Sequence, residues 1–239
     1  MKLMSFDLEI SKILPEFSGN LFEYAPLGIS CAAVAHDEVV FWQGIPQLSK
    51  KECQILVKDL MAYASSGYTF VTWNGCGFDF RVLAQESGMV EECGEMALNH
   101  VDLMLLVTFT KGWFLGLDKA LQGANIAGKV HEVTLVNGEI LYNMDGGMAP
   151  ELCAKEEYDA VLTYLRGDVE QTLELAKVVQ ETQRIRWTSG RGKAQSTSVP
   201  RLKTVRECFD IPEPDTSWMT DPPRREDFVS WIPEWEKKI

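Results

Sequence analysis

The sequence of 239 residues lacks the cysteine spacing that zinc sites and small disulfide scaffolds need. Its six cysteines include no C-x-x-C pair, and the nearest two, Cys76 and Cys93, stand 17 positions apart (93 − 76). The spacing therefore argues against a structural zinc site and against a disulfide framework. We expect reduced cysteines and a cytoplasmic protein.

Long hydrophobic runs are also missing. No apolar stretch approaches the roughly 20 residues that span a bilayer. Asp7 and Glu9 interrupt the N-terminal segment where a signal peptide would need an apolar centre. We therefore expect neither a signal peptide nor a contact with a membrane.

The chain has no excess of basic residues. It holds 23 basic and 35 acidic residues, a net charge of −12, whereas proteins that coat nucleic acid usually carry net positive charge. With 46% hydrophobic and 24% charged residues, the composition is that of a globular protein with a buried core. The length fits one large domain or two small ones.

Hydrophobic periodicity and turn residues predict an α/β order of elements. Strands are expected at 2–10, 27–35, 38–43 and 67–73, a loop at 11–26, and helices from Ser49 to about 65, at 78–87, at 116–125 and at 150–181. Residues 100–108 fit a strand or a helix, and Asn137-Gly138 predicts a two-residue turn in a hairpin at 129–144. This order predicts one α/β domain with a mixed sheet.

The composition changes after about residue 186. Six of the ten prolines lie between 200 and 233, and four of the seven tryptophans are Trp187, Trp218, Trp231 and Trp235. Such aromatic surface is costly to leave in water. We therefore expect a domain at 1–185 and a C-terminal extension at 186–239 that packs on it.

Two acids stand on a strand that otherwise looks buried. Asp7 and Glu9 share one face of strand 2–10, roughly 7 Å apart along it, and buried carboxylates repel each other unless a cation lies between them. The alternative is a solvated strand end. A D-x-E pair is a weak motif in an acidic chain, where Asp168-Val169-Glu170 is a second example.

The longest expected helix holds a further acid in an apolar position. Asp168 lies in its hydrophobic stripe, and Tyr164 is one turn earlier on the same face. An ionised Asp there needs a partner, which is either a metal ion or a buried Lys or Arg. Asp79 and Asn74 belong to the turn after strand 67–73, where both residue types also have ordinary local roles.

Taken together, FDLE at 6–9, NGCGFD at 74–79 and YLRGD at 164–168 resemble the three motifs of the DEDD 3′–5′ exonucleases. Tyr164, with Thr163 in place of a histidine, resembles the tyrosine subtype (DEDDy), similar to the proofreading domain of family B DNA polymerases. The resemblance covers about residues 1–181. It implies a ribonuclease H-like mixed five-stranded sheet flanked by helices. We expect the 129–144 hairpin to be an insertion in this fold and the C-terminal extension to be an addition to it. Because we recognise no polymerase portion, we expect a stand-alone exonuclease.

The resemblance implies two divalent cations, Mg²⁺ or Mn²⁺, and a role for each acid. Asp7 would bridge both ions, Glu9 and Asp168 would complete the site of the ion that activates water, and Asp79 would hold the second ion. Tyr164 would orient the attacking water. The expected reaction releases nucleoside 5′-monophosphates from a nucleic acid 3′ end, with DNA favoured over RNA and no obligate protein partner.

A basic strip offers a substrate surface. Residues 183–206 contain seven basic residues and no acid. Within it Trp187 is expected to stack on a base, and Arg191 and Lys193 to bind phosphate; Asn74 would contact the substrate or fix its turn. The alternative is a solvated linker with incidental charge.

Three other functions remain open on sequence alone. They are a non-catalytic nuclease-like module that binds nucleic acid or a protein, an exoribonuclease on the same fold, and a phosphohydrolase that acts on small molecules. Asp102 is a further acid among apolar residues. Its alternatives are a place at the border of the site and a strand-end or capping role, and we expect the second.

Overall fold

A computed structural model of the chain describes residues 1–15 and 20–239; the part of the expected 11–26 loop at 16–19 lies outside the described residues. The strands are β1 (Lys2–Ile10), β2 (Ile29–Ala35), β3 (Val39–Gln43), β4 (Tyr68–Thr72), β5 (Val101–Asp102), β6 (Glu132–Thr134), β7 (Ile140–Tyr142), β8 (Arg184–Thr188) and β9 (Ala194–Ser198). The helices are α1 (Lys50–Ser65), α2 (Asp79–Ser87), α3 (Val90–Asn99), α4 (Leu103–Lys111), α5 (Leu117–Gly123), α6 (Ala149–Ala154), α7 (Tyr158–Thr182) and α8 (Val205–Cys208).

A five-stranded mixed sheet forms the centre of the molecule, in the order β3-β2-β1-β4-β5. β2 runs antiparallel to β1 and β3, whereas β4 runs parallel to β1 and β5. β1 is the central strand, and its residues are buried along most of their length. This is the ribonuclease H-like α/β arrangement that the sequence predicts.

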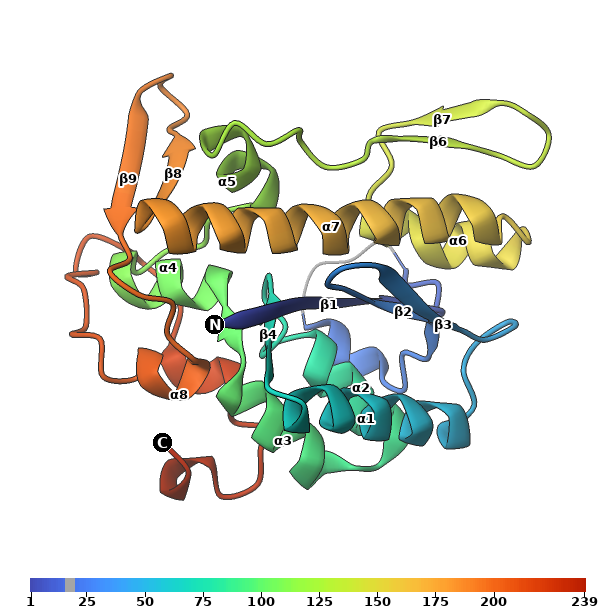
Figure 1. Cartoon of the computed structure of the whole chain (residues 1–239), viewed down its shortest axis with the longest axis horizontal. Coiled ribbons are helices and arrows are strands. Elements are labelled where there is room, and N and C mark those ends of the chain that lie inside the picture. Colours follow the sequence, from blue (N-terminus) through green and yellow to red (C-terminus); the bar gives the residue numbers. More distant parts are fainter. Residues whose placement is uncertain (16–19) are drawn as a thin grey trace.

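Helices cover the two faces of the sheet (Figure 1): α7 crosses one face, and α1, α2 and α3 lie against the other. The Ser5 hydroxyl of β1 donates a 2.6 Å hydrogen bond to the Val169 carbonyl of α7. This buried contact fixes the middle of α7 over the central strand, so that residues of the two elements face each other.

Local signals account for several element ends. Ser49 caps α1 through a reciprocal pair of hydrogen bonds with Glu52, as expected. The ambiguous 100–108 segment contains both predicted forms, because β5 ends at Asp102 and the Asp102 carboxylate caps α4 by accepting from the Leu105 amide. Helix α3, at Val90–Asn99, was not anticipated.

Two expectations about the second half of the chain are wrong in detail. The 150–181 helix is two helices, α6 and α7, because the backbone leaves the helical conformation at Glu156, where φ is 63°. The hairpin at 129–144 exists as β6 and β7, but its loop has three residues, 136–138, and Gly138 adopts a φ of 85°. Such a loop is a type I turn followed by a left-handed residue.

The chain after α7 forms the β8–β9 hairpin and then returns along α4 and α3 toward the C-terminus (Figure 1). The expected domain limit after residue 185 falls inside β8. Trp187 is buried and Trp231 and Trp235 pack against the core, but Trp218 is 69% exposed. Among the described residues, no helix has the length and apolarity that crossing a membrane requires.

Candidate active site

The second half of β1 carries Asp7 and Glu9 on the face that α7 covers. Phe6 and Leu8 alternate with them and are buried in the core. Glu9 is buried and Asp7 is half-buried, so this strand end is not the solvated edge that would explain two acids without a function. The β1 backbone therefore holds two carboxylates in place inside the fold.

Asp168 reaches the same point from the middle of α7. Oxygen atoms of Asp7, Glu9 and Asp168 all lie within 4.8 Å of one another. Asp168 is 4% exposed and Tyr164, one helical turn earlier, is 1% exposed. The hydrophobic stripe of α7 thus brings an acid and a tyrosine to the acids of β1.

Asp79, the first residue of α2, lies beside Asp7. The Leu8 amide donates to Asp79 Oδ1 at 3.1 Å and to Asp7 Oδ1 at 3.0 Å. Asp79 is buried, and after burial the neighbouring Asp7 carboxylate is the main cause that raises its pKa. The four acids that the sequence motifs predict are therefore close together, although Asp79 is not one of the three whose oxygens meet.

Lys129 is the site residue that the sequence analysis missed. Its Nζ lies 2.8 Å from Asp168 Oδ2 and donates a 2.6 Å hydrogen bond to the Tyr164 hydroxyl. Burial lowers the pKa of Lys129, but the neighbouring Asp168 carboxylate and Tyr164 outweigh it, and the net direction is upward. The segment can approach α7 because Gly167 has no side chain: a Cβ there would lie 2.3 Å from Val130 Cγ2.

The surroundings of the four acids favour their protonated forms, because burial and mutual repulsion outweigh the nearby positive charge. Burial, followed by the charge of Asp168, raises the pKa of Asp7 to about 6. Burial also raises the pKa values of Glu9, Asp79 and Asp168, and for Glu9 and Asp79 the Asp7 charge adds to the effect. Asp168 Oδ1 is buried and, among the described residues, has no hydrogen-bond partner. An all-oxygen site with an unpaired buried acceptor and repelling carboxylates fits a hard divalent cation.

The turn between β4 and α2 carries Asn74 in a left-handed conformation, with a φ of 73°, which Asn tolerates better than most residues. Asp102 holds this turn, because its carboxylate accepts from the Asn74 amide at 3.0 Å and from the Cys76 amide at 3.1 Å. Burial raises the pKa of Asp102 to about 6, against these hydrogen bonds. The expected capping role of Asp102 is confirmed.

The β8–β9 hairpin separates the expected substrate residues into two groups. Arg191 and Lys193 lie at its exposed tip. Trp187 points inward: it is 7% exposed and packs edge-on against Trp113 at 5.5 Å between ring centroids. The expected stacking of Trp187 on a base stays a prediction, and it would require the buried Trp187 side chain to turn outward.

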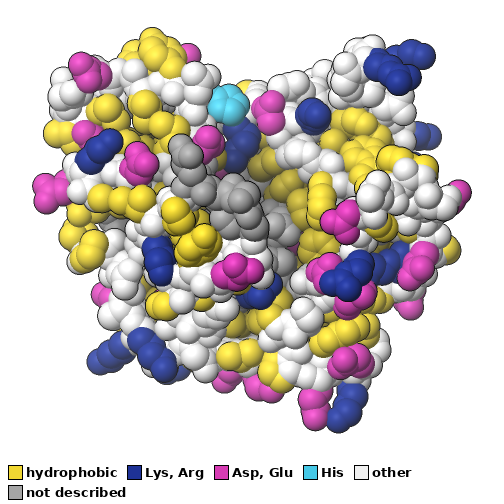
Figure 2. Space-filling model, turned by 180° about the vertical axis from the view of Figure 1, so that it is seen from behind, with side chains coloured by type: hydrophobic (Ala, Val, Ile, Leu, Met, Phe, Trp, Pro, Cys, Tyr) yellow, Lys and Arg dark blue, Asp and Glu magenta, His cyan; other side chains and the backbone are white. Residues whose placement is uncertain are grey.

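Seen from behind, the molecule has a notch between two lobes (Figure 2). Figure 1 places the β6–β7 hairpin at one end of α7 and the β8–β9 hairpin at the other, which accounts for the lobes. Lys and Arg side chains stand on the lobe at the β8–β9 end, and acidic and basic side chains meet in the notch. The notch gives this side of α7 a concave surface.

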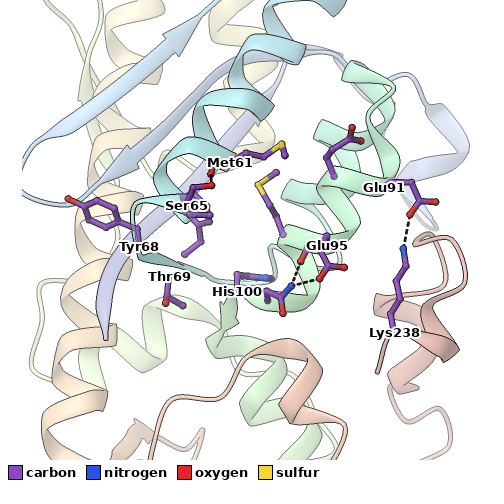
Figure 3. Close-up of a pocket in the computed structure, with 13 residues that line it drawn as sticks. Met61, Ser65, Tyr68, Thr69, Glu91, Glu95, His100 and Lys238 are labelled. Carbon is purple, nitrogen blue, oxygen red and sulfur yellow. Dashed lines mark hydrogen bonds and ion pairs between the residues drawn. The ribbon is translucent and has the colours of Figure 1, made fainter.

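A cavity of about 730 Å³ lies away from these acids, between α1 and α3 (Figure 3). Its lining includes Tyr68, Thr69 and Phe70 at the N-terminal end of β4, whereas Asn74 and Asp79 come after the C-terminal end of that strand. Lys238 pairs with Glu91 at its rim, 2.7 Å apart. None of the four motif acids lines this cavity, so size alone does not identify the candidate active site.

No protein-family model matches the sequence, and no curated protein does. Among solved structures, the family B DNA polymerase of the hyperthermophilic archaeon Pyrobaculum calidifontis is similar, with a TM-score of 0.54 and 15% identity over 74% of this chain. The match spans 24% of that polymerase. Likeness at this identity establishes the fold alone, and the fold is shared with one part of a much longer enzyme.

Proposed function

We propose that the chain is a metal-dependent 3′–5′ exonuclease of the tyrosine subtype that releases nucleoside 5′-monophosphates and favours single-stranded DNA. The observation that carries the proposal is the meeting of Asp7, Glu9 and Asp168 oxygens within 4.8 Å, with Asp79 beside Asp7 and Tyr164 beside Asp168. The fold likeness to a DNA polymerase supports nucleic acid as the substrate. In this proposal residues 1–185 form the nuclease and 186–239 an extension.

Asp7, Glu9 and Asp168 would hold one divalent ion, and Asp79 with Asp7 a second. An all-oxygen donor set favours Mg²⁺ or Mn²⁺ over zinc. When bound, two such ions supply a more acidic water and stabilise charge on both the attacking and the leaving oxygen of a phosphodiester. The raised pKa values of the acids support this role, since added positive charge would favour their ionised forms.

Tyr164 and Lys129 would position the water for attack. Lys129 carries only donors, so the Tyr164 oxygen accepts in their 2.6 Å hydrogen bond. The Tyr164 hydrogen is therefore the group's own donor: it faces Asp168, whose pKa the Tyr164 hydroxyl lowers, and in the proposed reaction it would be donated to a water or to a phosphate oxygen. Lys129 thereby fixes the direction in which the Tyr164 hydroxyl points, and at the same time it offsets part of the negative charge of Asp168.

Arg191 and Lys193 would bind the phosphates of the strand, and Asn74 would contact its 3′ end. Both basic residues are exposed on the β8–β9 hairpin. The notch between the two hairpins (Figure 2) would receive the strand. In this arrangement, the basic residues guide the strand by charge and the acids act only at its end.

The test is to incubate the chain with DNA and RNA oligonucleotides labelled at the 3′ or the 5′ end, with Mg²⁺, with Mn²⁺ and with a chelator. We expect stepwise loss from the 3′ end that requires the metal. Asp168→Asn should abolish it. The matched control is Glu170→Gln, an exposed acid two residues later on α7, which should retain wild-type activity.

Other outcomes identify the alternatives. Cleavage of RNA in preference to DNA would make the chain an exoribonuclease. Activity on free nucleotides without activity on oligonucleotides would indicate a small-molecule phosphohydrolase. Binding of oligonucleotides without hydrolysis under any metal would favour a non-catalytic module, and equal activity of Asp168→Asn and wild type would refute the assignment of the site.

A further inference from the structure

A second cavity, of about 410 Å³, is lined in part by the turn that leads into Asp79. Its lining residues come from the turn after β4, from the α4 region and from the C-terminal extension: Asn74, Gly77, Met104, Phe114, Pro223, Arg224, Asp227 and Phe228. Gly77 precedes Asp79 by two residues, so one turn forms a wall of this cavity and also places an acid of the metal site.

The extension is fastened to that turn. The Trp231 indole donates to the Cys76 carbonyl at 2.9 Å and to the Phe228 carbonyl at 3.0 Å. A Cβ on Gly77 would lie 3.2 Å from the Phe228 ring, so the two segments pack closely. These contacts make residues 223–228 a fixed wall of the cavity.

The chemistry of the lining matches a nucleobase. Phe114 is 55% exposed, and its ring centroid lies 6.0 Å from that of Phe228, so the cavity offers aromatic surface to a flat ring. Within residues 1–15 and 20–239, the Asn74 side-chain amide has no hydrogen-bond partner. Arg224 and Asp227, paired at 2.6 Å, add both donors and acceptors. Aromatic faces combined with polar edges are what an unpaired base requires.

We propose that residues 223–228 of the extension, with Phe114 and Asn74, form a binding subsite for one unpaired base near the 3′ end of the substrate strand. This inference rests on the proposed function and names its substrate more closely. A base paired in a duplex cannot enter such a cavity, so the extension would make the enzyme prefer single-stranded ends.

The experiment measures binding of the full chain, in chelator, to 5′-fluorescein-labelled deoxyoligonucleotides by fluorescence anisotropy. One oligonucleotide is intact, and the others carry an abasic residue at one of the last four positions. We expect Phe114→Ala to bind the intact strand about 5- to 100-fold more weakly. One abasic position should weaken binding of wild type and leave binding of Phe114→Ala unchanged.

Trp218→Ala is the matched control, because Trp218 is a large exposed aromatic of the same extension that does not line the cavity. Phe114→Trp should bind the intact strand about as tightly as wild type, whereas Phe114→Leu should bind it as weakly as Phe114→Ala. Because Leu keeps an apolar side chain but offers no ring, this pair separates the loss of stacking from a loss of folding. If wild type hydrolyses oligonucleotides but Phe114→Ala binds like Trp218→Ala, the subsite is refuted and the exonuclease stands. If wild type neither binds nor hydrolyses them, both proposals fail.

Discussion

Two regions of the molecule carry opposite charges and differ in burial. One is the group of four acids around the second half of β1, and the other is the basic tip of the β8–β9 hairpin. Glu9, Asp79 and Asp168 are buried on the central strand and on two helices, whereas Arg191 and Lys193 are exposed on a two-stranded hairpin. Charges in the interior interact strongly, while exposed charges are screened by water and salt. Each acid should therefore matter individually, and the basic residues should matter mainly through their sum.

The largest effect is expected at the buried acids. Asp7→Asn should lower activity about a thousandfold or more, since it removes a ligand of the proposed metal pair. In chelator the same change should raise the melting temperature, because burial and Asp168 oppose the Asp7 charge in the folded chain. Steady-state kinetics and thermal unfolding measure the two effects. Asp37→Asn, with a fully exposed side chain, should change neither.

An intermediate effect is expected at Lys129, the positive charge inside the acidic region. Lys129→Met should lower kcat about 10- to 100-fold, because Tyr164 and Asp168 lose the group that orients them. It should also lower the Mg²⁺ concentration at which half of the maximal rise in melting temperature is reached, since Lys129 competes with the metal ion for the Asp168 carboxylate. Lys119→Met, exposed on α5, is the control. An unchanged kcat and an unchanged Mg²⁺ dependence would assign Lys129 to packing alone.

The sequence reveals the acids because each one violates a pattern. Asp7 and Glu9 interrupt a strand of otherwise buried residues, and Asp168 takes a position in α7 where helical spacing predicts an apolar side chain. Lys129 violates nothing, because it lies in an irregular segment between α5 and β6 where a lysine is ordinary. The general argument that a buried acid needs a cation left a metal ion and a buried Lys or Arg as alternatives, and it could not say where in the chain a basic residue would be found.

The elements of the fold were predictable where the sequence carries a strong local signal and not elsewhere. Strong periodicity and the Ser49 cap gave β1, β2, β3, α1 and β4, whereas the break between α6 and α7 occurs at Glu156, a non-glycine residue with positive φ that carries no local signal. Trp187 shows a different difficulty. A count of tryptophans predicts that the extension packs, but only the alternation of β8 shows that Trp187 faces inward while Arg184 and Arg186 face outward.

The smallest effect is expected at the hairpin tip. Reversing Arg191 and Lys193 together to Glu should weaken oligonucleotide binding several-fold at low salt, and the loss should shrink as salt rises, because each phosphate contact contributes through counterion release. The slope of log affinity against log salt should fall in magnitude by about 1.4 for two lost contacts to a single strand. Lys50→Glu with Lys51→Glu is the matched reversal, exposed at the start of α1 on the opposite face of the sheet. If both double variants change affinity and slope alike, the acidic chain responds only to its total charge. If the hairpin variant alone changes the slope, the strand lies on the β8–β9 hairpin, and the exposed region guides the substrate while the buried acids act on it.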